Sequence, residues 1–271
     1  MAINPRISEN YRYTTNMDRI STTKVMAEDV NETAASGRKL KRISDDPVST
    51  VKVLRNRSKI ANIDQFRKTI DFGKGFLTKT EDALSSIYES LVRVKEICIQ
   101  QSNTTYDAPA RHAVAQEVKQ IMNHVTLLGN SRYNDKYIFG GFQTSQPPVA
   151  PDGAYLGDDG WIYIQIDEDS FRPINVSGRD VFGVPTEHEG KRPLLVNILE
   201  NVYSSLESYN PDLLHTSMVQ LDLAMESVIG VTASLGARQA ALKDASERID
   251  KGEVQLHEDT NNLEATDMVK S

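Results

Sequence analysis

The 271-residue sequence contains one cysteine and one tryptophan, and only 7% of its residues are aromatic. The single cysteine, Cys98, excludes an intrachain disulfide, and its place in an apolar helical pattern predicts a buried side chain rather than a nucleophile. No apolar run approaches the length of a membrane span, and Met1 to Tyr13 lacks the hydrophobic segment of a secretory signal peptide. We therefore expect no membrane insertion, and we expect any export from the cell to use another route.

The charge balance argues against nucleic acid as a partner. The net charge is -7, whereas proteins that bind nucleic acid generally carry a basic surface. The charge is also uneven, because residues 1–59 hold 12 Lys and Arg against 7 Asp and Glu, and residues 143–190 hold 2 against 9. A basic segment and an acidic middle suggest oriented packing against neighbours, although for the second count alone a solvated acidic insert is the favoured explanation.

Motifs for chemistry are missing from the sequence. Gly73-Lys74-Gly75 lacks the spacing of a phosphate loop, no Gly-x-Ser-x-Gly elbow occurs, and the acidic runs lack the order of a calcium loop. None of the five histidines stands at metal-site spacing on a helix with another histidine or with the cysteine; they are His112, His124, His188, His215 and His257. We expect no catalytic residue, no metal site and no cofactor, so the protein is not predicted to be an enzyme.

Apolar residues recur in strict sevens near the end of the chain. These seam residues are Leu221, Val228, Leu235, Leu242, Ile249, Leu256 and Leu263. Such spacing keeps one side of a long helix facing a partner helix. The second seam position becomes polar from Thr232 onward, through Gln239 to Thr260. A stripe this narrow predicts packing on other helices of the same chain, with the bare end left for other molecules.

Four further helices are predicted, the first from about Glu9 to Ser36. Asp46 as an N-cap and Pro47 as the first helical residue start a second helix that runs to about Asn103. Its apolar seam includes Leu77, Leu84, Ile87, Leu91, Val94 and Cys98. A third helix follows Pro109 and ends at Gly129, a short one begins at Pro193, and Asn210-Pro211 starts the long final helix.

Turn residues concentrate between about Arg132 and Arg192, where Tyr137–Phe139 and Trp161–Ile166 read as short strands. The fold class is therefore mainly α with a small β-rich insert: a long antiparallel helical rod built from N- and C-terminal segments, with a variable β domain in the middle. The expected domains are an N-terminal helix and linker (1–46), two halves of the rod (47–142 and 191–271) and the β-rich outer domain (143–190).

Paired motifs near the two ends carry a resemblance to a known family. Arg6-Ile7-Ser8, Ser36–Leu40 and Ser44-Asp45-Asp46-Pro47-Val48 are followed, far along the chain, by Ser234-Leu235-Gly236-Ala237-Arg238. In this order the motifs resemble those of bacterial flagellins and the related hook-associated proteins. Tyr133–Gly141, which includes Tyr137, Phe139, Gly140 and Gly141, is similar to the pattern of the proteins at the junction between hook and filament.

The resemblance implies a structural protein of the flagellum, located outside the cell at the hook-filament junction. About eleven copies would form a closed ring between the preceding hook-associated protein and flagellin. A minor or short flagellin that forms the filament itself is the alternative; an unrelated coiled-coil adaptor would not need the paired motifs. The resemblance also implies type III export with an export chaperone. It further implies an apolar helix after the Glu264–Asp267 region, so we expect either that this arm is missing from the sequence or that this version of the protein is short.

The resemblance assigns structural roles to particular residues. Rod packing and subunit contact would involve Leu77, Leu84, Leu91 and Val94 together with the seven seam residues of the final helix. Met17, Ile20, Val25 and Val30 of the first helix would pack in an inner tube.

Overall fold

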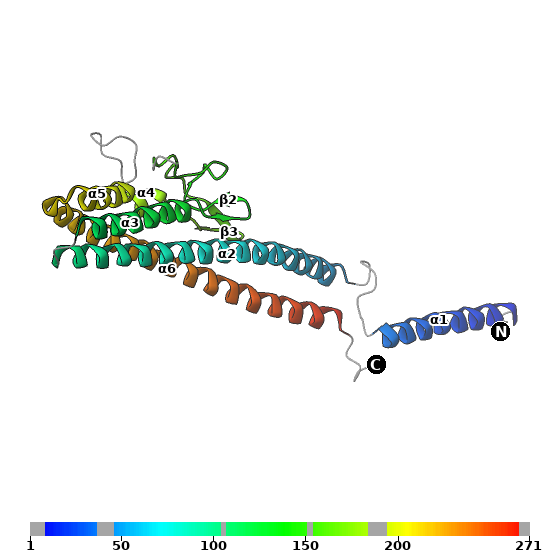
Figure 1. Cartoon of the computed structure of the whole chain (residues 1–271). Coiled ribbons are helices and arrows are strands. Elements are labelled where there is room, and N and C mark those ends of the chain that lie inside the picture. Colours follow the sequence, from blue (N-terminus) through cyan, green and yellow to red (C-terminus); the bar gives the residue numbers. More distant parts are fainter. Residues whose placement is uncertain (1–8, 37–45, 104–106, 151–153, 184–193, 266–271) are drawn as a thin grey trace, which may run out of the picture. The chain divides into compact units, whose positions relative to one another are not determined.

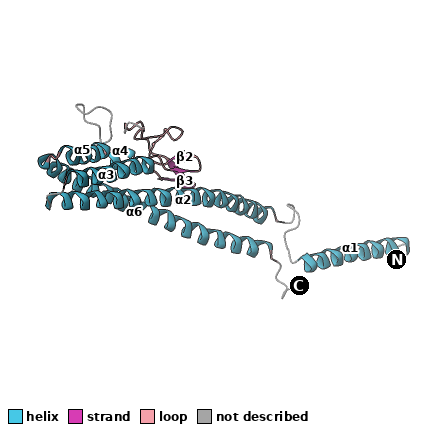
Figure 2. Cartoon of the chain, viewed as in Figure 1, coloured by secondary structure: helices cyan, strands magenta, loops and turns pink. Residues whose placement is uncertain are grey.

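The computed structural model describes residues 9–36, 46–103, 107–150, 154–183 and 194–265. Helices dominate these ranges, and the strands are short (Figure 2). The chain divides into two compact units. Unit 1 comprises residues 1–64 and 250–271, and unit 2 comprises residues 65–249. The predicted fold class, mainly α with long helices from the N- and C-terminal segments and a small β-rich insert between them in the sequence, is confirmed.

The two longest helices are α2 (Pro47–Asn103) and α6 (Pro211–Glu264), and each contributes to both units. Within unit 2 they run antiparallel, because Lys95 Nζ lies 2.6 Å from Asp222 Oδ1 while Gln239 Nε2 donates to Glu81 Oε2 at 2.8 Å. Gln239 is one of the polar residues at the second seam position. Its bond to α2 explains why that position need not be apolar.

Two shorter helices, α3 (Ala108–Gly129) and α5 (Leu194–Ser208), pack against each other in unit 2 (Figure 1). His112 Nδ1 of α3 lies 2.7 Å from Glu207 Oε1 of α5. The helix starts follow the predicted caps. Asp46 Oδ1 accepts the N–H groups of Val48 and Ser49, both at 3.1 Å, and Asn210 Oδ1 accepts the N–H of Leu213 at 3.1 Å.

The insert contains two small hairpins and a short helix. Strands β1 (Arg132–Tyr133) and β2 (Lys136–Tyr137) pair antiparallel, as do β3 (Tyr163–Asp167) and β4 (Ser170–Pro173), and α4 spans Gly178–Phe182. The predicted strand at Tyr137–Phe139 is wrong at its end, since β2 stops at Tyr137 and Phe139 is a core residue in a bend. Phe139 is held in position by burial of its side chain and not by pairing within a strand.

Unit 1 contains α1 (Glu9–Ser36), the start of α2 and the end of α6. The ends of α2 and α6 contact each other. Asn56 Nδ2 donates to Thr260 Oγ1 at 3.3 Å, and Arg57 Nη2 donates to Glu264 Oε1 at 2.7 Å. Val53 and Thr260 are buried at this contact. The two segments therefore pack against each other as a helix pair.

Candidate assembly surfaces

The predicted seam residues of the rod are largely core residues. Ten apolar side chains along α2 and α6 are buried, with exposed fractions of 9% or less; they are Leu77, Leu84, Ile87, Leu91, Val94, Leu221, Val228, Leu235, Leu242 and Ile249. The last two seam residues, Leu256 and Leu263, are only half-buried. Packing inside the chain accounts for the first ten, whereas the end of α6 in unit 1 leaves part of its seam uncovered.

The predicted inner-tube residues of α1 are exposed. Met17, Ile20, Val25 and Val30 have exposed fractions between 51% and 63%. From Tyr11 to Glu32 every side chain except that of Thr15 is exposed. Most of the stability of a helix in a protein comes from tertiary packing of its apolar residues, and α1 has almost no such packing within the described chain.

The motif residues Tyr137 to Gly141 form a tightly held corner of the insert. Phe139 is fully buried, and its ring meets that of Phe182 edge-on with centroids 5.6 Å apart. Gly141 has φ of +66°, a left-handed conformation, and an added Cβ would collide with Asp158. The glycine at 141 is therefore required for the local backbone path.

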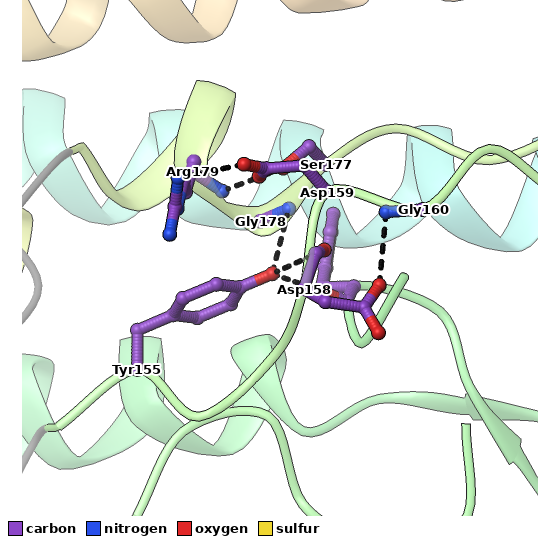
Figure 3. Close-up of polar contacts among 8 residues, drawn as sticks. Tyr155, Asp158, Asp159, Gly160, Ser177, Gly178 and Arg179 are labelled. Atoms are coloured by element: carbon purple, nitrogen blue, oxygen red, sulfur yellow. Dashed lines mark hydrogen bonds and ion pairs between the residues drawn. The ribbon is translucent and has the colours of Figure 1, made fainter. Parts of the chain in front are cut away.

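Tyr155 and Asp158 connect this corner to the rest of the insert (Figure 3). The Tyr155 hydroxyl donates to the Phe139 carbonyl at 2.8 Å and accepts the Gly178 N–H at 3.1 Å. Asp158 Oδ1 accepts the N–H groups of Phe142 at 2.7 Å and Gly160 at 2.9 Å. Burial raises the pKa of Tyr155 to about 12, so this hydroxyl stays protonated and acts as a structural link.

A second set of contacts surrounds the tyrosine. Asp159 Oδ1 accepts from Ser177 Oγ at 2.8 Å, and its other carboxylate oxygen lies 2.7 Å from Arg179 Nη1 (Figure 3). Ser177 Oγ in turn accepts the Arg179 N–H at 3.1 Å and so caps α4. Asp158 and Asp159 thus connect separate segments of the insert.

Arg238, in the motif on α6, binds the insert. Its guanidinium lies 4.8 Å from the ring centroid of Trp161, and Nη1 donates to the Asn175 carbonyl. Burial lowers the pKa of this guanidinium, but an arginine stays charged in proteins. The neighbouring Gly236 and Ala237 are exposed. Arg238 therefore has a packing role within the chain. At Gly236, by contrast, the helix surface is open, since nothing lies within 4 Å of a Cβ placed there.

Two glycines in the middle of α2 had no predicted role beyond weakening the helix. A Cβ at Gly73 would lie 2.6 Å from Ile164 Cδ1, and one at Gly75 would collide with the Tyr133 ring. Tyr133 also lies against Phe72 and Phe76, with centroids 5.6 and 6.1 Å away. The two glycines thus allow the insert to approach α2 closely. In the sequence, two glycines within an otherwise regular helix were the signal that could have indicated such a close contact.

Asn175 begins a pattern that resembles a glycosylation site, Asn175-Val176-Ser177. Its side chain is fully buried, Nδ2 donates to the Gly160 carbonyl at 2.7 Å, and Oδ1 accepts the Ile162 N–H at 2.7 Å. Attachment of a sugar would break both bonds, so the folded insert offers no acceptor here.

Metal-binding clusters and cavities are the features that could support chemistry within the described ranges. There, no group of three or more His, Cys, Asp or Glu residues could hold a metal ion. A cavity of about 300 Å³ lies between α4, α5 and α6, and its lining, which includes Phe182, Leu195 and Leu223, has no ionisable side chain. This cavity can accommodate apolar groups but supplies no acid or base.

By length and composition alone, α6 could cross a membrane. From the sequence we expect no membrane span, and burial offers another explanation for some of the apolar residues of this helix. Leu221, Val228 and Leu235 are buried inside unit 2, and Asp222 pairs with Lys95. Core packing therefore accounts for part of the apolar character of the helix, whereas Val219, Leu223 and Ile229 are more than half exposed.

The described part of the Ser44-Asp45-Asp46-Pro47-Val48 motif begins α2. Pro47 is an exposed residue at the start of α2 beside its capping residue Asp46, while Ser44 and Asp45 lie outside the described residues.

Comparison with known proteins identifies flagellar relatives. Flagellar hook-associated protein 3 of Escherichia coli is 22% identical over 268 residues, which cover 98% of this chain and 83% of the relative. The protein of the same name from Salmonella typhimurium is 23% identical, and the match covers 75% of this chain but only 65% of the relative. The flagellar filament 30.7 kDa core protein of Treponema maltophilum is 24% identical, with 88% and 78% covered.

A solved structure has the same fold. The crystal structure of Bacillus cereus FlgL matches with a TM-score of 0.66 and 20% identity, over 76% of this chain and 99% of that one. Residues 7–144 match the family described as bacterial flagellin N-terminal helical region. Because that match covers 138 of 271 residues, just over half, the chain belongs to the bacterial flagellin family defined by this helical region.

Proposed function

We propose that the chain is a structural protein of the bacterial flagellum that forms the ring at the hook-filament junction and joins the preceding hook-associated protein to the flagellin filament. The observation that carries the proposal is the set of apolar side chains on α1, from Met17 to Val30, that are more than half exposed. A helix of this kind becomes stable when neighbouring molecules cover it, which is the situation of a subunit in a tubular assembly.

The hook-associated relatives support the junction over the filament. Two of the relatives carry the name flagellar hook-associated protein 3, and the E. coli protein matches 98% of this chain. The Tyr137–Gly141 corner, similar to the junction pattern, is built into the core through Phe139. The filament protein of T. maltophilum supports the alternative, a minor flagellin.

The proposed role includes further partners. About eleven copies would form the ring, closed by one repeated contact between unlike surfaces of neighbouring copies. The chain would reach this place, outside the cell, through type III export with the help of a chaperone. No catalysis, cofactor or metal is required, because the role consists of binding between protein surfaces.

The proposal is tested by deletion of the gene in the native bacterium. We expect electron microscopy to show hooks without filaments, and an immunoblot to detect flagellin shed into the medium. A plasmid copy of the wild-type gene should restore filaments, and gold-labelled antibody against the chain should mark the hook-filament boundary.

Two results would contradict the junction role. Filaments that persist after deletion would exclude it. Gold label along the whole filament would instead support the alternative that this chain is itself a flagellin.

A further inference from the structure

Two methionines on α1 are the most exposed sulfur-containing residues of the described ranges. Met17 is 51% exposed and Met26 is 63% exposed. The remaining methionine and cysteine side chains of these ranges are half-buried or buried in unit 2; they are Met122, Met218, Met225 and Cys98. The two α1 methionines are therefore the sulfur side chains that a small solute reaches first.

The two α1 methionines lie on opposite sides of the helix, because a separation of about nine residues is about two and a half turns. Met17 has Tyr13 and Ile20 as neighbours at i−4 and i+3. Met26 has Val30 as its neighbour at i+4, and all three neighbouring side chains are more than half exposed. Each methionine thus belongs to a separate apolar strip. A surface that covers α1 from either side meets one of the two sulfur atoms.

The thioether of methionine reacts with hydroperoxides without help from a catalytic group. The sulfur lone pair attacks one oxygen of hydrogen peroxide, so that an S–O bond forms while the O–O bond breaks. The proton on the transferred oxygen passes to the departing oxygen, which leaves as water. The sulfur is oxidised by two electrons and the peroxide is reduced. The product, methionine sulfoxide, is polar, and burying it against an apolar surface is unfavourable.

We propose that Met17 and Met26 are an oxidation site of the unassembled chain, and that sulfoxide at either residue keeps the chain out of the flagellum. The inference rests on the proposed function, because it requires neighbouring subunits to cover α1. Neither residue belongs to the core of unit 2, so the oxidised chain keeps that core and loses contacts with other subunits. Subunits already assembled are protected, because the neighbours that cover α1 also exclude the peroxide.

Oxidation of the purified chain tests the first half of the proposal. The chain is treated briefly with hydrogen peroxide, and sulfoxide at each methionine is measured by peptide mass spectrometry. We expect Met17 and Met26 to react about threefold faster than the three methionines of unit 2, as their exposure dictates. In isolated flagella they should react no faster than those of unit 2. A sample unfolded in urea is the control, because there all five residues should react at equal rates.

Glutamine substitution tests the effect on assembly, because glutamine has about the length of methionine and a polar end like that of the sulfoxide. The variant M17Q/M26Q replaces the native chain in the bacterium. We expect about tenfold less of it than of wild type in the flagella, with the remainder in the medium, because each glutamine places a polar group in an apolar contact. The matched control L127Q/I229Q also replaces two exposed apolar residues, both in unit 2, and should assemble.

Peroxide treatment of growing cells separates oxidation from a general need for apolar residues on α1. Cells that lack methionine sulfoxide reductases produce either wild type or M17L/M26L, and each strain is compared with its own untreated culture. We expect mild peroxide to lower the amount of wild-type chain in the flagella about threefold and to leave that of M17L/M26L unchanged, because leucine has no sulfur to oxidise.

The outcomes separate this inference from the proposed function. Three results would each overturn the oxidation site: equal oxidation rates at all five methionines of the folded chain, assembly of M17Q/M26Q at the level of its control, or equal losses of wild type and M17L/M26L under peroxide. Absence of the untreated wild-type chain from the flagella would overturn the proposed function, and the inference with it.

Discussion

Arg238 joins the family motif on α6 to the insert through two unlike contacts. The guanidinium lies over the Trp161 ring and donates to the Asn175 carbonyl. Asn175 is buried and uses its amide to hold Ile162 and Gly160. One α6 side chain thus contacts two segments of the insert, which are 14 residues apart in the sequence.

We predict that R238A lowers the free energy of unfolding by about 1.5 kcal/mol, because it removes a cation–π contact and a charge-assisted hydrogen bond. Urea denaturation measures the loss, and fluorescence of Trp161, the sole tryptophan, reports the local change. R248A is the matched control, since Arg248 is exposed on the same helix. Equal stabilities of the two variants would contradict the assigned role.

Cys98 makes stability depend on alkaline pH. Burial raises its pKa from 9.0 to about 12, so the unfolded chain releases this proton at lower pH than the folded one. The resulting stabilisation is complete below pH 9 and is lost as the pH rises toward 12. We predict that the free energy of unfolding of wild type relative to C98A is constant up to pH 9 and then falls.

Denaturant titrations of both proteins at several pH values check this prediction. Tyrosine and lysine ionisation affects both proteins alike and cancels in the difference. A difference that stays constant through the alkaline range would show that Cys98 ionises equally easily in the folded and unfolded chain.

At the scale of elements, the glycines of α2 and α6 serve opposite purposes. A Cβ added at Gly75 would collide with the Tyr133 ring, whereas nothing lies within 4 Å of a Cβ added at Gly236. We predict that G75A destabilises the chain by about 1–2 kcal/mol through displacement of Tyr133. G236A should stabilise it by about 1 kcal/mol, because alanine favours a helix more than glycine does.

Thermal and urea unfolding of the two variants measure this contrast. Equal gains in both would mean that Tyr133 moves aside at no cost. The pair is well matched, because each substitution adds one methyl group within a long helix.

The helices were predictable from the sequence, whereas only the β-rich character of the insert and the approximate place of β3 were. The starts at Pro47 and Pro211 follow local rules of capping, which residues such as Asp46 and Asn210 satisfy by themselves. The fold of the insert depends on distant contacts, such as that between Tyr155 and Phe139, which no spacing encodes. The roles of Gly73, Gly75 and Arg238 also required knowledge of which insert residues face the helices.

At the scale of the whole molecule, burial divides the chain unevenly. Unit 2 contains most of the buried apolar residues, from Ile70 to Ile249, while the α1 side chains in unit 1 are nearly all exposed. Segments with few buried contacts open at low free energy and are cleaved first by proteases. The same argument explains why a subunit of an assembly can leave part of its surface uncovered until its neighbours arrive.

We predict that brief trypsin treatment of the purified chain cuts after Arg12, Arg19 and Lys24 of α1 well before it cuts after Lys79 or Lys243 in unit 2. All five are exposed in helices, so accessibility of the side chain alone does not distinguish them. The free energy of local unfolding distinguishes them, because α2 and α6 around Lys79 and Lys243 are held by Leu77 and Leu242 in the core. Mass spectrometry of timed samples gives the order of cleavage.

In isolated flagella the α1 bonds should become resistant, since neighbouring subunits would cover Met17 to Val30. Equal cleavage of these bonds in the two preparations would show that α1 remains uncovered after assembly.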